Sequence, residues 1–215
     1  MRDPSTQIAG PIDSDLDIER AADILNRGGV IGIPTDTVYG IAASLDHPDA
    51  IERLFELKGR PTGKPIPILI SSVASVPALA IDVREPVTLF LSEFWPGGLT
   101  VVLPGRPGLP RSLTGPDGTV GLRVPDHRIA LSVIERVGGA IACTSANIAG
   151  SAPALSAHEV SDVFGDRLDY VLDGGQAPNG TASTLVSFSC EELHVLRQGP
   201  VSESSLRAAW NATQG

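Results

Sequence analysis

Apolar runs of strand length alternate with amphipathic segments of helical length along nearly the whole sequence. The apolar runs cover 30–34, 66–70, 99–104, 119–125, 140–146, 170–173, 183–188 and 193–197. The segments with helical spacing of apolar residues cover 15–29, 47–59, 72–80, 85–95, 127–139, 156–165 and 202–212. Strands that alternate with helices in this way are typical of an α/β sheet covered by helices on both faces.

The last two apolar runs, 183–188 and 193–197, lie too close in sequence for a helix to connect them. Two such strands pair antiparallel through a short turn, so the sequence predicts a mixed parallel and antiparallel sheet. No internal repeat or break in composition divides the chain, and we expect residues 1–215 to form one domain. In open α/β sheets ligands bind beyond the strand ends, so a binding site is expected on the connecting loops.

Composition and charge narrow the class of protein. Hydrophobic residues make up 42% and charged residues 19%, which is ordinary for a globular protein. The net charge is −9, whereas proteins that bind nucleic acid nonspecifically are usually basic, so any contact with RNA should be transient. The sequence shows no signal peptide, no apolar stretch near the ~18 residues of a membrane span, and no CxxC motif. These features predict a cytoplasmic protein without membrane association.

The segment PTDTVYG (34–40) places three hydroxyls and a carboxylate directly behind a buried strand. One explanation is a capped turn, because Thr and Asp readily satisfy backbone groups at strand ends and helix starts. The other is a pocket for a small polar ligand. The segment alone leaves both open.

Three further loops carry unusual polar chemistry: KGRPTGKP (58–65), TSANIAG (144–150) and NGTASTLV (179–186). Each also has a simpler explanation. A Lys-Gly-Arg segment after a helix can be a solvated complement to the helix dipole, and TSAN can be a helix-cap turn. A binding role for these loops becomes more plausible when they are considered together with two arginines that stand in strands.

Arg123 and Arg197 stand within or at the end of apolar strands, where an arginine needs an anionic partner or a route to solvent. Taken alone, Arg123 could simply pair with Asp126 or another carboxylate. If the strands and loops meet on one side of the sheet, however, five cations gather there beside many hydroxyls. That combination suits a polyanionic ligand. The five cations are Lys58, Arg60, Lys64, Arg123 and Arg197.

The common catalytic motifs are absent. GRPTGK does not have Walker A spacing, there is no GxGxxG, and no GxSxG surrounds Ser145. The four histidines are scattered without zinc-ligand spacing, and Cys143 has no His nearby in sequence. The remaining possibility is positioning and electrostatic catalysis on a phosphate substrate, assisted by a divalent metal.

The ordered set of motifs resembles the threonylcarbamoyl-AMP synthase family, the YrdC-like proteins. The motifs are PTDTVYG, KGRP, FWPGGLTVVLP, VGLRVPDH, TSANIAG, LDGG, STLV and LRQGP, and the resemblance covers a core of about 17–200. It implies a twisted mixed sheet flanked by helices, with a concave, positively lined cavity. It also implies ATP, L-threonine and bicarbonate or CO2 as substrates, with Mg²⁺ assisting. The product, threonylcarbamoyl-AMP, would serve tRNA modification through separate transfer proteins.

The resemblance also implies roles for individual residues, matched motif by motif. The catalytic residues would be Lys58, Arg60, Ser145 and Asn147. The ATP site would contain Arg60, Lys64, Thr119, Ser145, Pro153 and Arg197. The threonine site would contain Thr37, Arg123, Cys143 and Ser183, with no metal ligand from the chain. PTDTVYG would then belong to an amino-acid pocket, with Thr35, Asp36 and Tyr39 as structural supports.

The sequence departs from the family pattern in two ways. The chain ends about fifteen residues after LRQGP and so resembles the single-domain form of the family, and Leu69 stands where some members place a His near threonine.

There are also two rival functions. One rival is an RNA-binding factor, against which the acidic charge and the 4% aromatic content argue. The other is a carbamoyl-phosphate-using enzyme of the hydrogenase-maturation type, whose zinc-finger-like Cys motifs are missing here.

Overall fold

One nine-stranded sheet runs through the computed structural model, which describes residues 15–59, 64–189 and 192–214. The strand order is β7-β1-β2-β6-β3-β5-β4-β8-β9, with parallel pairing at β7–β1, β3–β5 and β4–β8 and antiparallel pairing elsewhere. The sheet is therefore mixed, as the sequence predicted. The strands are β1 (Val30–Ile33), β2 (Gly40–Ser44), β3 (Ile68–Ile70), β4 (Leu99–Pro104), β5 (Thr119–Arg123), β6 (Ala140–Ser145), β7 (Tyr170–Val171), β8 (Thr184–Ser189) and β9 (Glu192–Arg197).

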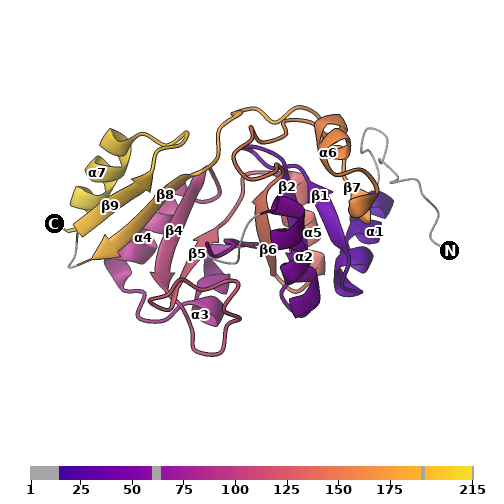
Figure 1. The fold of residues 1–215 in the computed structure, drawn as a ribbon. Helices are drawn as coiled ribbons and strands as arrows, with labels where there is room; N and C mark the ends of the chain where they lie inside the picture. Colours follow the sequence, from indigo (N-terminus) through magenta and orange to yellow (C-terminus); the bar gives the residue numbers. More distant parts are fainter. Residues whose placement is uncertain (1–14, 60–63, 190–191, 215) are drawn as a thin grey trace.

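Seven α-helices and two short 3-10 turns surround the sheet in the described part of the chain (Figure 1). The helices are α1 (Asp15–Asn26), α2 (Pro48–Lys58), α3 (Val76–Leu79), α4 (Glu85–Phe94), α5 (Arg128–Arg136), α6 (Ala157–Phe164) and α7 (Glu203–Ala212). The 3-10 turns are η1 (Val73–Ser75) and η2 (Gly165–Arg167). Each expected helix forms within a few residues of its predicted bounds. The segment 72–80 is divided into η1 and α3.

Two apolar cores hold the helices to the sheet. One joins α1 and α5 to strand residues such as Ile31, Ile141 and Leu69. The larger one takes the apolar faces of α2, α4, α6 and α7 together with the opposite face of the strands. Since successive strand side chains point to opposite faces, the assignment of Ile68 and Leu69 to different cores follows from the pleat.

The strand β2 (Gly40–Ser44) was not predicted from the sequence. Its sequence GIAAS contains no aromatic residue and one β-branched residue, so its strand propensity is weak. All five residues are nevertheless buried, because β2 lies between β1 and β6 in the interior of the sheet. The predicted β8–β9 pair is confirmed as antiparallel.

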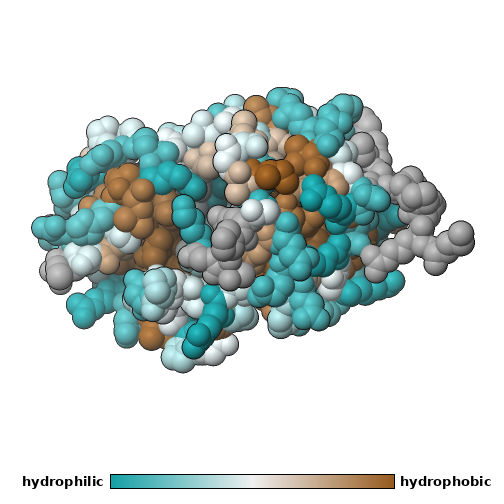
Figure 2. Space-filling model, in the orientation of Figure 1, coloured by the Kyte–Doolittle hydropathy of each residue, from teal (hydrophilic) through white to brown (hydrophobic). Residues whose placement is uncertain are grey.

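Hydrophilic side chains cover most of the rim of the face drawn in Figure 2, and hydrophobic residues are exposed mainly over the strands at its left and beside α2. Among the described residues, no helix has both the length and the apolar character that a membrane span requires.

Candidate functional site

A cavity of about 350 Å³ lies against one face of the sheet. Its floor includes Leu69 of β3, which is paired with Arg123 of β5, and Thr100 of β4, which is paired with Leu185 of β8. Strands β3, β4, β5, β6 and β8 contribute side chains from the sheet surface. Loops such as PTDTVYG line the cavity, as expected from the sequence, and the sheet itself forms its floor.

The Arg123 guanidinium is buried at the floor of this cavity and held on three sides. Its Nε donates to the carbonyl oxygen of Gly97 at 2.9 Å, its Nη1 to Thr37 Oγ1 at 2.9 Å, and its Nη2 to Asp36 Oδ1 at 2.5 Å. Asp36 also accepts from the backbone N–H of Asp126 at 3.1 Å. The carboxylate that pairs with Arg123 is therefore Asp36 and not Asp126. Burial lowers the pKa of Arg123, and the Asp36 charge opposes that shift.

The PTDTVYG segment forms a buried hydrogen-bonded turn and also lines the cavity. Thr35 and Thr37 are 4% and 1% exposed and lie with their hydroxyl oxygens 3.0 Å apart. The Tyr39 hydroxyl donates to the carbonyl oxygen of Gly175 at 2.7 Å and accepts from the N–H of Gly174 at 3.0 Å, which ties the LDGG loop to the residue before β2. A capped turn and a pocket lining are thus compatible explanations for this segment, because the same hydroxyls stabilise the turn and face the cavity.

Lys58, Ser145 and Asn147 form a compact polar cluster at the wall of the cavity. Lys58 Nζ donates to the Ser145 carbonyl oxygen at 2.8 Å, to Ser145 Oγ at 3.1 Å and to Asn147 Oδ1 at 2.6 Å. Ser145 Oγ in turn donates to Asn147 Oδ1 at 2.7 Å. Lys58 is only 3% exposed, so a solvated helix end is excluded for it. TSAN caps no helix either, because the next helix, α6, begins only at Ala157.

Arg197 reaches the same cavity from the end of β9. Its Nε and Nη2 donate to the Ser183 carbonyl oxygen at 3.1 Å and 2.8 Å, and Ser183 Oγ lies 2.7 Å from Thr100 Oγ1. Partial burial lowers the pKa of Arg197, and the nearby charge of Arg123 lowers it further. Two like charges that face one cavity favour an anionic occupant.

Cys143 lies in the floor of the cavity with its thiol buried. Burial raises its pKa to about 12, although Arg123 and Lys58 act in the opposite direction. The thiol is thus protonated at neutral pH and is a poor nucleophile. The backbone of β2 approaches Cys143 closely here, because a Cβ on Gly40 of that strand would lie 2.5 Å from Cys143 Sγ.

The structure brings most of the predicted site residues together, but not all. The predicted residues that line the cavity are Thr37, Lys58, Lys64, Arg123, Cys143, Ser145, Ser183 and Arg197. Asn147 lies just behind this lining, where it holds Lys58 and Ser145. Arg60 falls outside the described residues.

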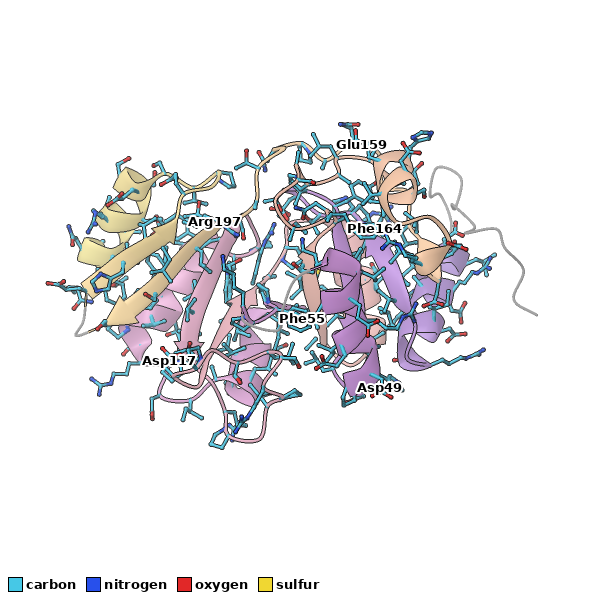
Figure 3. The ribbon with its side chains drawn as sticks, in the orientation of Figure 1. Asp49, Phe55, Asp117, Glu159, Phe164 and Arg197 are labelled. Atoms are coloured by element: carbon cyan, nitrogen blue, oxygen red, sulfur yellow. The ribbon has the colours of Figure 1, made fainter. Side chains whose placement is uncertain are left out.

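Thr119 and Pro153 are not among the residues that line the cavity. Thr119 Oγ1 donates to Asp117 Oδ1 at 2.7 Å, and Figure 3 shows Asp117 at the opposite end of the strands from Arg197. Next to Pro153, Ala154 bonds through its backbone to Tyr39 and Ala146. Their assignment to the ATP site stays a prediction.

Sequence reasoning missed Thr100 entirely and left Thr35 and Asp36 as supports without assigned partners. Thr100 is the one hydroxyl in the apolar run LTVVL, and it could have been noticed as a polar residue at a buried strand position. The partner of Asp36 carries no local signal, because Arg123 lies 87 residues away.

The described residues include no group of three or more His, Cys, Asp or Glu side chains able to hold a metal ion. Asp36, the carboxylate beside the cavity, already accepts from Arg123 and Asp126. These residues do not fit a metal centre built by the protein. A Mg²⁺ ion would have to bind mainly through substrate phosphates and water, as Mg²⁺ commonly does.

Comparisons with known proteins identify the family. Residues 23–199 match the Sua5–YciO–YrdC family model, whose description reads "Telomere recombination". The chain is 38% identical to a threonylcarbamoyl-AMP synthase of Pyrococcus abyssi, over 85% of this chain and 54% of that protein. It is 34% identical to one of Bacillus subtilis, over 91% of this chain and 57% of that protein.

A solved structure supports the same relationship. It is the crystal structure of P. abyssi Sua5 complexed with L-threonine, which matches with a TM-score of 0.88 and 35% identity, over 94% of this chain and 59% of that one. The chain spans little more than half the length of these relatives. With a family model that matches most of the sequence, the chain belongs to the Sua5–YciO–YrdC family, which includes the threonylcarbamoyl-AMP synthases that its motifs resemble.

Proposed function

We propose that this chain is an L-threonylcarbamoyladenylate synthase, a nucleotidyltransferase that makes threonylcarbamoyl-AMP and pyrophosphate from L-threonine, bicarbonate or CO2, and ATP. One observation carries the proposal furthest. The described lining of the cavity contains four cationic side chains and no carboxylate, and it adds several hydroxyls. Such a lining suits an occupant with several negative charges and a polar body, such as a nucleoside triphosphate beside a carboxylate. The cations are Lys58, Lys64, Arg123 and Arg197.

The proposed reaction needs positioning and charge neutralisation rather than a protein nucleophile. The amine of threonine loses a proton and combines with CO2 to give a carbamate. A carbamate oxygen then forms a bond to the α-phosphorus of ATP while the bond to the bridging oxygen of the β-phosphate breaks, and pyrophosphate leaves. Both reactants are anions, so the cavity's cations reduce their repulsion and hold them in line. The raised pKa of Cys143 agrees with a mechanism that uses no thiolate.

Other members of the site have roles in binding within this proposal. Arg123 and Thr37 hold the amino acid, while Arg197, Lys64 and Ser145 face the nucleotide; Thr119, Pro153 and Arg60 extend the nucleotide site. A Mg²⁺ ion bound to the triphosphate would supply charge neutralisation there, while Lys64 and Arg197 face the nucleotide from the protein. The proposal includes a cytoplasmic location, release of the adenylate to separate tRNA-modifying transfer proteins, and at most transient contact with tRNA.

Threonine-dependent pyrophosphate release by the purified chain tests the proposal. We expect release that requires threonine, bicarbonate and ATP together and needs no RNA. Carbamoyl phosphate as the productive substrate would instead favour a hydrogenase-maturation type of chemistry. Tight RNA binding without pyrophosphate release would favour the RNA-binding alternative, and either result would overturn the proposal.

A further inference from the structure

The hydroxyl protons of Thr35 and Thr37 can be assigned from their partners. Thr35 Oγ1 lies 2.6 Å from the carbonyl oxygen of Val38, which can only accept, so the single hydroxyl proton of Thr35 is directed there. The 3.0 Å contact between the two hydroxyls is therefore donated by Thr37. Thr35 Oγ1 also accepts from the backbone N–H of Thr37 at 3.2 Å, which fills its second lone pair. Thr35 is fully satisfied and fixes the direction of the Thr37 proton.

The Thr37 hydroxyl is left as a pure acceptor toward the cavity. Its proton goes to Thr35, and one of its lone pairs accepts from Arg123 Nη1 at 2.9 Å. The second lone pair has no partner among the described residues, and Thr37 lines the cavity. A ligand group that binds there must bring its own N–H or O–H.

Arg123, in contrast, needs a ligand group that accepts hydrogen bonds. Three of its five N–H bonds are used by Gly97, Thr37 and Asp36. One N–H on each terminal nitrogen has no acceptor within the described part of the chain, and this pair suits a carboxylate. The site therefore offers donors and an acceptor side by side. An α-amino acid has the complementary groups on a single carbon.

We propose that Thr35 is a positioning residue that orients the amine of the amino-acid substrate by fixing the proton of Thr37. The substrate carboxylate binds Arg123, and its amine donates to Thr37 Oγ1, first as the free amino acid and then as the carbamate N–H. This inference rests on the proposed function, because it takes an amino acid as the occupant. An uncharged acceptor beside a cationic guanidinium also favours loss of the ammonium proton, which the amine needs before it can attack CO2.

The test compares L-threonine with (R)-3-hydroxybutyrate, which keeps the carboxylate, hydroxyl and methyl groups but has no amine. Ligand-observed NMR titration of the full chain measures both affinities, and their ratio reports the contribution of the amine. We expect threonine to bind the wild type roughly 10- to 150-fold more tightly, the range for a hydrogen bond to a charged group. In Thr35→Val the Thr37 hydroxyl can rotate, and the ratio should fall by about tenfold. The affinity for ATP should change less than about twofold, since the effect is confined to the amine.

Thr35→Ser is the matched control, because it keeps the hydroxyl that accepts from Thr37, and it should retain the wild-type ratio. An unchanged ratio in a folded Thr35→Val protein overturns the inference. If Thr35→Val does not fold, Thr37→Val provides the decision: the ratio should again collapse while 3-hydroxybutyrate still binds through Arg123, and a wild-type ratio would refute the assignment. A wild type that binds ATP but neither probe would instead show that the proposed function itself is wrong.

Discussion

Asp36 and Arg123 form a buried ion pair across 87 residues of sequence, with 2.5 Å between Asp36 Oδ1 and Arg123 Nη2. The pair joins the loop after β1 to the end of β5 and sets the position of the guanidinium in the cavity floor. Because the carboxylate also accepts from Asp126 N, one side chain connects two loops of the site. Its removal should therefore affect both stability and activity.

Asp36→Asn should lower the free energy of unfolding by about 3–5 kcal/mol, because it leaves the buried Arg123 charge without its counterion. Urea denaturation measures this change. Asp126→Asn is the matched control: its side chain is exposed and only its backbone bonds Asp36, so its stability should change by less than about 0.5 kcal/mol. Equal stability of Asp36→Asn and the wild type would show that the pair does not stabilise the fold.

Lys58→Met should lower both stability and turnover. It removes the cationic donor shared by the Ser145 carbonyl oxygen and Asn147 Oδ1, and a hydrogen bond to a charged group contributes about 1.5–3 kcal/mol. Thermal unfolding and pyrophosphate release measure the two effects.

Lys64→Met is the comparison for that change, since Lys64 lines the same cavity but is exposed. It should weaken ATP binding, with little change in melting temperature. If the two variants behaved alike in both assays, the Lys58 cluster would have no structural role of its own.

Gly40→Ala should destabilise the protein by about 1–3 kcal/mol, because the new Cβ would lie 2.5 Å from Cys143 Sγ. The double variant Gly40→Ala/Cys143→Ala should recover most of this loss, since the added methyl then occupies volume that the sulfur has left. Denaturation of the two single variants and the double variant gives the coupling energy between the positions. Strictly additive effects would contradict the close contact.

His127 should make stability depend on pH in the mildly acidic range. Its Nδ1 is buried with no hydrogen-bond partner among the described residues, and burial lowers its pKa below the ordinary 6.5, although Asp36 and Asp126 oppose the shift and Arg128 adds to it. The fold favours the neutral ring, so this contribution to stability is fully present above pH 6.5 and is lost as the pH falls through the folded pKa.

Urea denaturation between pH 7 and pH 5 measures this effect, with His127→Gln as the reference. The wild type should lose stability faster than the variant as the pH falls. Parallel pH profiles for the two proteins would mean that the His127 ring titrates equally in the folded and unfolded states.

The sequence alone determined the class of fold and the order of its elements apart from β2, because these follow from local periodicity. The helix α1 ends near the predicted glycine pair, where Gly28 takes a positive φ of 80° that suits glycine, and the β8–β9 pair follows from the short separation of its strands. The strand β2 did not follow, since GIAAS has weak strand propensity and becomes a strand only through its neighbours β1 and β6.

For the site, the sequence supplied the chemical groups and the tertiary structure supplied their partners. The motifs identified Lys58, Ser145 and Asn147 as relevant, but only the tertiary structure, in which the last residue of α2 reaches the end of β6, shows that they bond one another. Likewise, the sequence could not choose between Asp126, three residues from Arg123, and Asp36, far away along the chain. That choice depends on the fold, which brings the loop after β1 to the end of β5, and hydrogen bonds and ion pairs act only over a few ångströms of space, whatever the separation in sequence.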